Sequence, residues 1–190
     1  MVRSFLAINL SVRANEALDR AIVGWRYLGK GVKWVKPGNL HITLKFLGDI
    51  TRSQIPQIAN VLDIITERTG PFNLSLGQPG VFPYPKRPRI LWVGLHGDTG
   101  PLKKFQGAIE KELAENGFEA DLRPFVPHIT VGRVKGRPPS MEKISHFLKT
   151  QIEAPVSTIE KIHLYQSILT PSGPIYKVLS THSLDLDSAS

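Results

Sequence analysis

A His-Ile-Thr tripeptide followed by an aliphatic residue occurs twice in this chain, at residues 41–44 and 128–131. The two copies lie 128 − 41 = 87 residues apart. The numbers of His and Thr in the chain would give roughly 0.3 His-x-Thr triplets by chance, so two matching copies are harder to dismiss than one. Both copies stand in β-rich runs that are typical of strands. The repeat therefore favours a duplicated fold with two equivalent strands, each carrying one His and one Thr.

The apolar periodicity around the two copies predicts the same order of elements twice: strand, helix, strand, helix. The first set is expected near residues 5–10, 18–28, 41–47 and 55–65, and the second near residues 90–95, 102–113, 125–134 and 141–148. Residues 72–76 resume extended structure, and the Pro-rich segment 79–88 is expected to be a loop or a sheet edge. Two last strands, near 158–169 and 175–184, flank turn residues typical of a hairpin.

The chemistry of the repeat follows from strand geometry, because side chains two residues apart point to the same face. His and Thr then share an open face, while the aliphatic residues of each copy enter the core. A pseudo-twofold relation between the halves would bring two imidazoles and two hydroxyls together. One imidazole can accept a proton while the other donates one, and the hydroxyls can donate to phosphate oxygens. This pattern favours metal-free cleavage of a phosphodiester by proton transfer.

Composition narrows the alternatives. The chain has no Cys, which excludes disulfides, thiolate nucleophiles and Cys-ligated zinc. His-x-Thr also lacks the partners of a zinc motif, so no metal site is expected. The other four histidines are interpreted as structural: His96, His146, His163 and His182. The formal charge of +8 favours a polyanionic partner such as RNA.

At these residues the chain resembles the 2H phosphoesterase superfamily, which is named for its two His-x-Thr/Ser motifs. It is most similar to the bacterial and archaeal RNA 2′,3′-cyclic phosphodiesterases, also called 2′-5′ RNA ligases. The likeness is not confined to the motifs: it covers four stretches of the chain, two of which include a motif. These are residues 3–8 (RSFLAI), 34–48 (WVKPGNLHITLKFLG), 127–133 (PHITVGR) and 167–176 (SILTPSGPIY).

The resemblance implies a bilobal α+β fold in which residues 1–190 form one domain. Each of the two pseudo-symmetric lobes would have an antiparallel sheet with outer helices, and the active-site cleft would lie between them. It further implies hydrolysis of RNA 2′,3′-cyclic phosphate ends to 2′-phosphomonoesters, with reverse 2′-5′ ligation of tRNA halves as a second activity. No metal and no nucleotide cofactor is implied.

Residue roles follow from the same resemblance. His41 would be the proton donor to the departing 3′ oxygen, and His128 the proton acceptor that activates water. Thr43 and Thr130 would hold the phosphoryl oxygens. Arg133 matches a basic residue that often follows the second motif, where it would contact phosphate or a base. Strict alternation places Arg133 on the face opposite His128, unless Gly132 marks a bulge that redirects it.

Other basic and aromatic residues have less specific roles. Several Lys and Arg side chains are interpreted as surface charges that together guide an RNA backbone: Lys33, Lys36, Lys45, Lys86, Arg87, Arg89, Lys135 and Arg137. Four aromatic residues are left open between stacking on a nucleobase and packing in the core: Phe5, Trp34, Tyr165 and Tyr176.

Two other functions remain open on the sequence alone. The same residues would serve a 2H phosphodiesterase that acts on a small cyclic nucleotide or on a 2′-5′ oligonucleotide. A non-catalytic RNA-binding module would explain the charge but has no need of two matched proton-transfer groups. The longest early apolar run, residues 5–8, is too short for a signal peptide or a membrane span. A cytoplasmic monomer with no membrane contact is the expectation.

Overall fold

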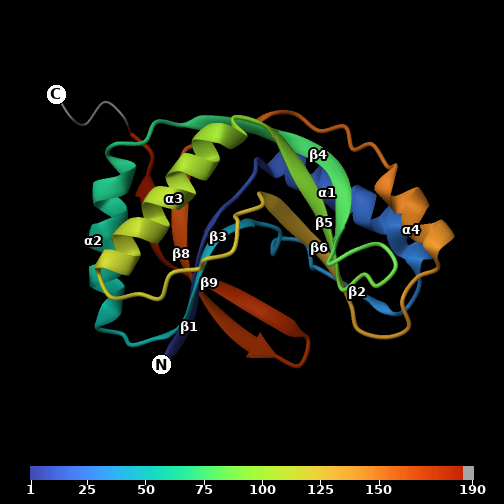
Figure 1. Ribbon diagram of the computed structural model, residues 1–190, viewed down its shortest axis with the longest axis horizontal. Helices are drawn as coiled ribbons and strands as arrows, with labels where there is room; N and C mark the ends of the chain where they lie inside the picture. Colours follow the sequence, from blue (N-terminus) through green and yellow to red (C-terminus); the bar gives the residue numbers. More distant parts are fainter. Residues whose placement is uncertain (186–190) are drawn as a thin grey trace.

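The computed structural model describes residues 1–185 and has the α+β fold that was predicted, with helices on the outside of a curled antiparallel sheet (Figure 1). The helices are α1 (Val12–Gly24), α2 (Gln54–Thr66), α3 (Thr99–Glu115) and α4 (Met141–Leu148), with a 3₁₀ turn, η1 (Trp25–Leu28). The strands are β1 (Val2–Ile8), β2 (Val32–Trp34), β3 (Ile42–Ile50), β4 (Phe72–Phe82), β5 (Ile90–Gly97), β6 (His128–Val134), β7 (Ser157–Ile159), β8 (Lys161–Thr170) and β9 (Gly173–Ser183).

The two lobes share a single sheet. Its strand order is β7-β4-β5-β6-β3-β1-β8-β9, with β2 pairing to β6. The lobes meet where β3 pairs with β6 through Ile42 and Ile129, the middle residues of the two repeats. On either side of this junction the arrangement is symmetric, since β1 flanks β3 as β5 flanks β6. The sequence repeat therefore marks the seam of the molecule.

Each lobe is built from both halves of the chain. Helices α2 and α3 pack together on the lobe that contains β3, β1, β8 and β9 (Figure 1). Helix α4 packs on η1 and β4, on the other lobe. The apolar stripe predicted for α3 is its buried face, and Leu102, Ile109 and Leu113 are fully buried there. Asn116 is the C-cap of α3, and Gly117 follows it with a φ of +86°.

Two strands depart from the expected boundaries. The Pro-rich segment was expected to be a loop or an edge, and its first residues form an edge: β4 runs on to Phe82, and beyond Leu74 it has β5 alone as a partner. Pro79 lies at a register shift on this edge, where its missing N–H is tolerated. The strand expected at residues 41–47 runs on to Ile50. Gly48 lies inside this extension with a φ of +68°, beside a second register shift.

Within residues 1–185, no helix combines the length and apolar character that a membrane span requires. The same residues contain no group of three His, Asp or Glu side chains that could hold a metal ion.

Candidate active site

The two repeats lie next to each other at the seam. Ile42 and Ile129 are buried at 0% and 1% exposure, while the His and Thr that flank each of them are half-buried. His and Thr of each repeat therefore share the opposite, helix-free side of the sheet, which we call the motif face. Extending the antiparallel register by one residue in each direction sets His41 across from Thr130 and Thr43 across from His128. In this register each motif His faces the Thr of the other copy across the seam.

Both motif strands carry a bulge directly after the motif Thr. Thr43 pairs with Ala7 but Lys45 pairs with Leu6, so Leu44 is the extra residue in β3. In β6, Thr130 pairs with Trp92 and Gly132 with Leu91, so Val131 is extra. The extra residue and the one after it are buried in both strands. A bulge reverses the alternation of faces, so the next residue returns to the motif face.

Arg133 reaches the motif face by this bulge. Strict alternation predicted the opposite face unless a bulge at Gly132 redirected the side chain, and the register has that bulge, with Val131 as the extra residue directly before Gly132. The Arg133 side chain is exposed, and its guanidinium contributes to a lowered pKa of both His41 and His128. The matching position in β3 is Phe46, which is 67% exposed. The structure therefore gathers all five residues singled out from the sequence on one face of the seam.

The two imidazoles are held in the same way. Nδ1 of His41 lies 2.8 Å from the carbonyl oxygen of Asn39, and Nδ1 of His128 lies 2.7 Å from that of Val126. A carbonyl only accepts hydrogen bonds, so Nδ1 carries the proton and donates it in both cases. This fixes the tautomer and leaves each Nε2 available to accept or donate a proton. Asn39 is itself held, because its Nδ2 donates to the carbonyl of Pro174 at 2.9 Å.

Aromatic rings surround both imidazoles. The His41 ring lies 4.9 Å from that of Phe5 and 5.2 Å from that of Tyr176. The His128 ring lies 5.2 Å from Phe82 and 6.0 Å from Trp92. Burial among these rings is the main cause that lowers the pKa of each imidazole below its ordinary value. The hydrogen bonds to Asn39 and Val126 act in the opposite direction.

The structure shows where the four aromatic residues that the sequence left open lie. Phe5 is only 3% exposed and forms the floor beneath His41. Trp34 packs against Trp25, with ring centroids 6.3 Å apart. Tyr165 and Tyr176 are half-buried and contact Phe5. Asn39, Phe82 and Trp92 were missed, because their approach to the histidines depends on which strands become neighbours.

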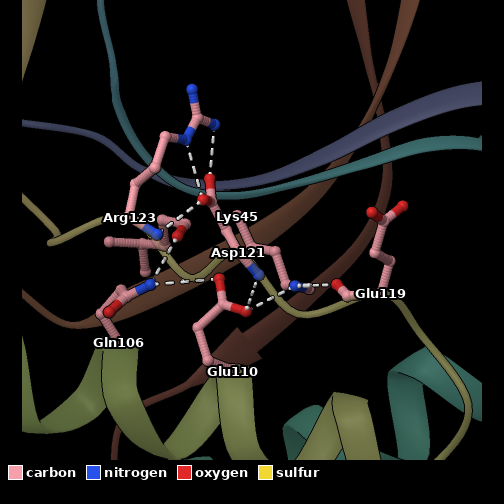
Figure 2. Close-up of polar contacts among 7 residues, drawn as sticks. Lys45, Gln106, Glu110, Glu119, Asp121 and Arg123 are labelled. Atoms are coloured by element: carbon pink, nitrogen blue, oxygen red, sulfur yellow. Dashed lines mark hydrogen bonds and ion pairs between the residues drawn. The ribbon is translucent and has the colours of Figure 1, made fainter.

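Lys45 was interpreted as a surface charge, and that interpretation is wrong. It is 3% exposed, because the bulge turns it into the core. Its Nζ donates to Glu110 Oε2 at 2.6 Å and to the carbonyl of Glu119 at 2.7 Å (Figure 2). Gln106 completes this cluster by donating to Glu110 and to the carbonyl of Leu44, the bulge residue (Figure 2). The cluster joins the first motif strand to α3 and to the segment that leads to His128.

Two of the other histidines have side-chain hydrogen-bond partners of their own. His182 is 6% exposed, with Nδ1 2.5 Å from Asp63 Oδ1 and Nε2 2.9 Å from Ser180 Oγ. His163 lies 2.9 Å from the hydroxyl of Thr181. These contacts agree with the structural role expected for both residues.

Comparison with known proteins gives one consistent result. The family profile described as the 2′-5′ RNA ligase superfamily matches residues 14–168. The chain is 34% identical to the RNA 2′,3′-cyclic phosphodiesterase of Methanothermobacter thermautotrophicus over 92% of this chain and 95% of that protein. It is 38% identical to the protein of the same name from Archaeoglobus fulgidus, over 78% of this chain and 82% of that one. The crystal structure of TT0787 from Thermus thermophilus superposes with a TM-score of 0.82 at 28% identity, covering 96% and 97% of the two chains.

Proposed function

The chain belongs to the 2′-5′ RNA ligase superfamily, and from that premise we propose that it hydrolyses the 2′,3′-cyclic phosphate ends of RNA to 2′-phosphomonoesters. The observation that carries the proposal is the matched pair of imidazoles at the seam. Both are fixed by a carbonyl two residues earlier in the chain, and both leave Nε2 free on the motif face. A non-catalytic binding module would not require two histidines held in the same tautomer.

The proposed reaction uses one histidine as general base and the other as general acid, on opposite sides of the cyclic phosphate. Nε2 of His128 accepts a proton from water as the water oxygen forms a bond to phosphorus. The bond between phosphorus and the 3′ oxygen breaks, and Nε2 of His41 donates a proton to that oxygen. The phosphate stays on the 2′ oxygen. In 2′-5′ ligation the 5′ hydroxyl of a second RNA takes the place of water, so His128 again accepts a proton from the nucleophile and His41 again donates one to the 3′ oxygen. The roles of the two histidines are exchanged in the reverse reaction, in which the 3′ hydroxyl attacks the 2′-5′ linkage and the 5′ oxygen leaves.

Thr43, Thr130 and Arg133 bind the phosphate in this scheme. The two hydroxyls donate to the non-bridging oxygens, and the guanidinium balances the charge that develops on them. Because each Thr lies across from the histidine of the other lobe, both lobes contact the same phosphate. We therefore treat residues 1–190 as one catalytic unit that acts as a monomer.

No metal or cofactor takes part in the proposed reaction. Proton transfer by two imidazoles serves both the nucleophile and the leaving group, and charge is balanced by Arg133 and the two hydroxyls. Activity is therefore expected to persist in EDTA.

Phosphorus NMR of a 2′,3′-cyclic mononucleotide, incubated with the purified protein in EDTA, tests the reaction directly. We expect conversion to the 2′-phosphate by the wild type, and loss of turnover by at least 10²-fold in His41→Ala and in His128→Ala, the lower end of what a general acid or base contributes. The control is His146→Ala, which removes an exposed histidine in the last turn of α4. Near-full activity in both motif variants would contradict the mechanism. Release of the 3′-phosphate instead would contradict the assignment of His41 as donor to the 3′ oxygen.

A further inference from the structure

The motif face continues past Arg133 as a row of basic side chains. Lys33 of β2 lies directly across from Arg133 of β6, and paired residues of neighbouring strands project to the same face. The two chain segments stay together beyond the strand ends, because the backbone N–H of Lys135 donates to the carbonyl of Gly31 at 2.8 Å. Lys33, Arg133 and Lys135 are all positive, and Lys33 and Arg133 are exposed at the end of β6 that is farther from His128.

A pocket of about 450 Å³ lies at the end of this row. Its walls come from the turn after η1, the segment after β6 and the first turn of α4. They comprise Leu28, Gly29, Lys30, Gly31, Arg137, Pro138, Pro139, Ser140 and Lys143. Three of these side chains are exposed cations, and none is acidic. Among residues 1–185, Lys30, Arg137 and Lys143 form no ion pair. Three unpaired positive charges around one hollow favour an anion.

The backbone around this pocket is closely packed and preformed. A Cβ atom on Gly31 would lie 2.3 Å from the carbonyl oxygen of Arg137, so the two segments approach as closely as only glycine permits. Pro138 and Pro139 fix the backbone that follows. A site that exists before the ligand arrives loses little free energy in becoming ordered.

We propose that this pocket binds a backbone phosphate of the RNA chain, on the 5′ side of the cyclic end. This inference rests on the proposed function, since it assumes that the cyclic phosphate occupies the motif face. Arg137 follows Arg133 by four residues, a span of at most about 13 Å because the chain bends at Gly136 and Arg137. The single phosphate of a mononucleotide held by the histidines cannot also occupy the pocket. The protein should therefore prefer an oligonucleotide to a mononucleotide, and the preference should reside in Lys30, Arg137 and Lys143.

The test compares a 2′,3′-cyclic mononucleotide with a short single-stranded RNA that ends in a 2′,3′-cyclic phosphate. The pocket variant is Lys30→Gln/Arg137→Gln/Lys143→Gln. The matched control removes three exposed lysines from α3, Lys103→Gln/Lys104→Gln/Lys111→Gln, so that both variants lose the same charge. We expect the pocket variant to lose about tenfold or more in kcat/KM on the RNA through a higher KM, with the mononucleotide unchanged. The salt dependence of RNA binding should also become shallower, by about 0.7 in log–log slope for each phosphate that the variant no longer neutralises.

Two further measurements separate the possible outcomes. Fluorescence anisotropy measures the binding of an unreactive RNA that ends in a 3′-phosphate, and this tests the pocket without any turnover. If the wild type turns over neither substrate, the proposed function is rejected, but the binding measurement still decides whether the pocket holds RNA. Inorganic phosphate is the competitor that distinguishes a site for small anions from a site for the RNA backbone. Equal effects of the pocket and control variants on the RNA would overturn the inference. The inference would also be overturned if the pocket variant lost kcat/KM equally on the RNA and on the mononucleotide. It would be overturned as well if millimolar phosphate abolished the difference in RNA binding between the wild type and the pocket variant.

Discussion

Arg133 has the same electrostatic influence on both histidines of the seam. After burial and the backbone hydrogen bonds, its positive charge further lowers the pKa of His41 and of His128. An acid–base pair is active between the two pKa values, where one imidazole is charged and the other neutral. Because both values lie below the ordinary imidazole value of about 6.5, the activity of the free enzyme should be greatest on the acid side of neutrality.

The first prediction is that Arg133→Gln moves the pH profile of kcat/KM to higher pH. Removing the guanidinium favours the protonated form of both imidazoles, so both limbs of the profile should shift in the same direction. The amplitude should also fall, since the phosphate loses a positively charged partner. The measurement is kcat/KM for a cyclic mononucleotide against pH, with the exposed Arg52→Gln as the control. A profile that falls in amplitude but does not move would show that Arg133 acts on substrate alone.

At the scale of elements, the bulge in β3 explains why a lysine is buried beside a catalytic motif. The bulge turns Lys45 inward. Its ammonium group forms an ion pair with Glu110 of α3 and donates a hydrogen bond to the carbonyl of Glu119. The equivalent residue after the bulge in β6 is Gly132, which needs no such partner. The two motif strands thus share a backbone shape but differ in the core beneath the bulge, where β3 has a buried ion pair and β6 has a glycine.

The second prediction is that Lys45→Met destabilises the protein by about 3 kcal/mol, because it leaves the Glu110 carboxylate unpaired and largely buried. The double variant Lys45→Met/Glu110→Leu should recover much of this loss, since no buried charge then remains. Urea unfolding at pH 7 measures both. The exposed pair Lys111–Glu115 supplies the control, and Lys111→Met should change the free energy of unfolding by less than about 1 kcal/mol. A double variant as unstable as the single one would contradict the explanation.

The sequence predicted the positions of helices better than it predicted which face of the sheet each side chain occupies. Helices α2, α3 and α4 lie where their apolar stripes indicated, because periodicity reports burial directly. The faces of His41 and His128 followed from alternation within an uninterrupted strand. Lys45 and Arg133 both lie beyond a bulge, which no periodicity reveals, and both differ from what alternation implies. The short strand β2 was missed, since three residues carry too little pattern.

At the scale of the whole molecule, buried imidazoles connect stability to pH. Burial lowers the pKa of His41, His128 and His163 in the folded protein. The unfolded chain therefore binds protons at a higher pH than the folded one. Stability from these groups is fully present above about pH 6.5 and is lost as the pH falls toward their folded values.

The third prediction is that the free energy of unfolding falls between pH 7.5 and 5.5, and that His41→Asn/His128→Asn makes this fall shallower. Urea unfolding at several pH values measures the slope. Asp121 does not interfere, because a hydrogen bond from Arg123 lowers its pKa to about 2, below this range. An unchanged slope in the double variant would place the linkage on other groups.

The lobes and the halves of the chain do not coincide. Strands β1 and β3 come from the first half of the sequence, but β8, β9 and α3 complete their lobe from the second half. The other lobe takes η1, β2 and β4 from the first half and β5, β6, β7 and α4 from the second. Neither half could fold by itself into a working lobe, because each lobe needs strands from both halves of the chain. The two halves are therefore intertwined and are not two separate domains joined end to end. A single cut in the exposed turn between β4 and β5 would leave two interlocked fragments, each holding one histidine of the pair and each dependent on the other for its shape.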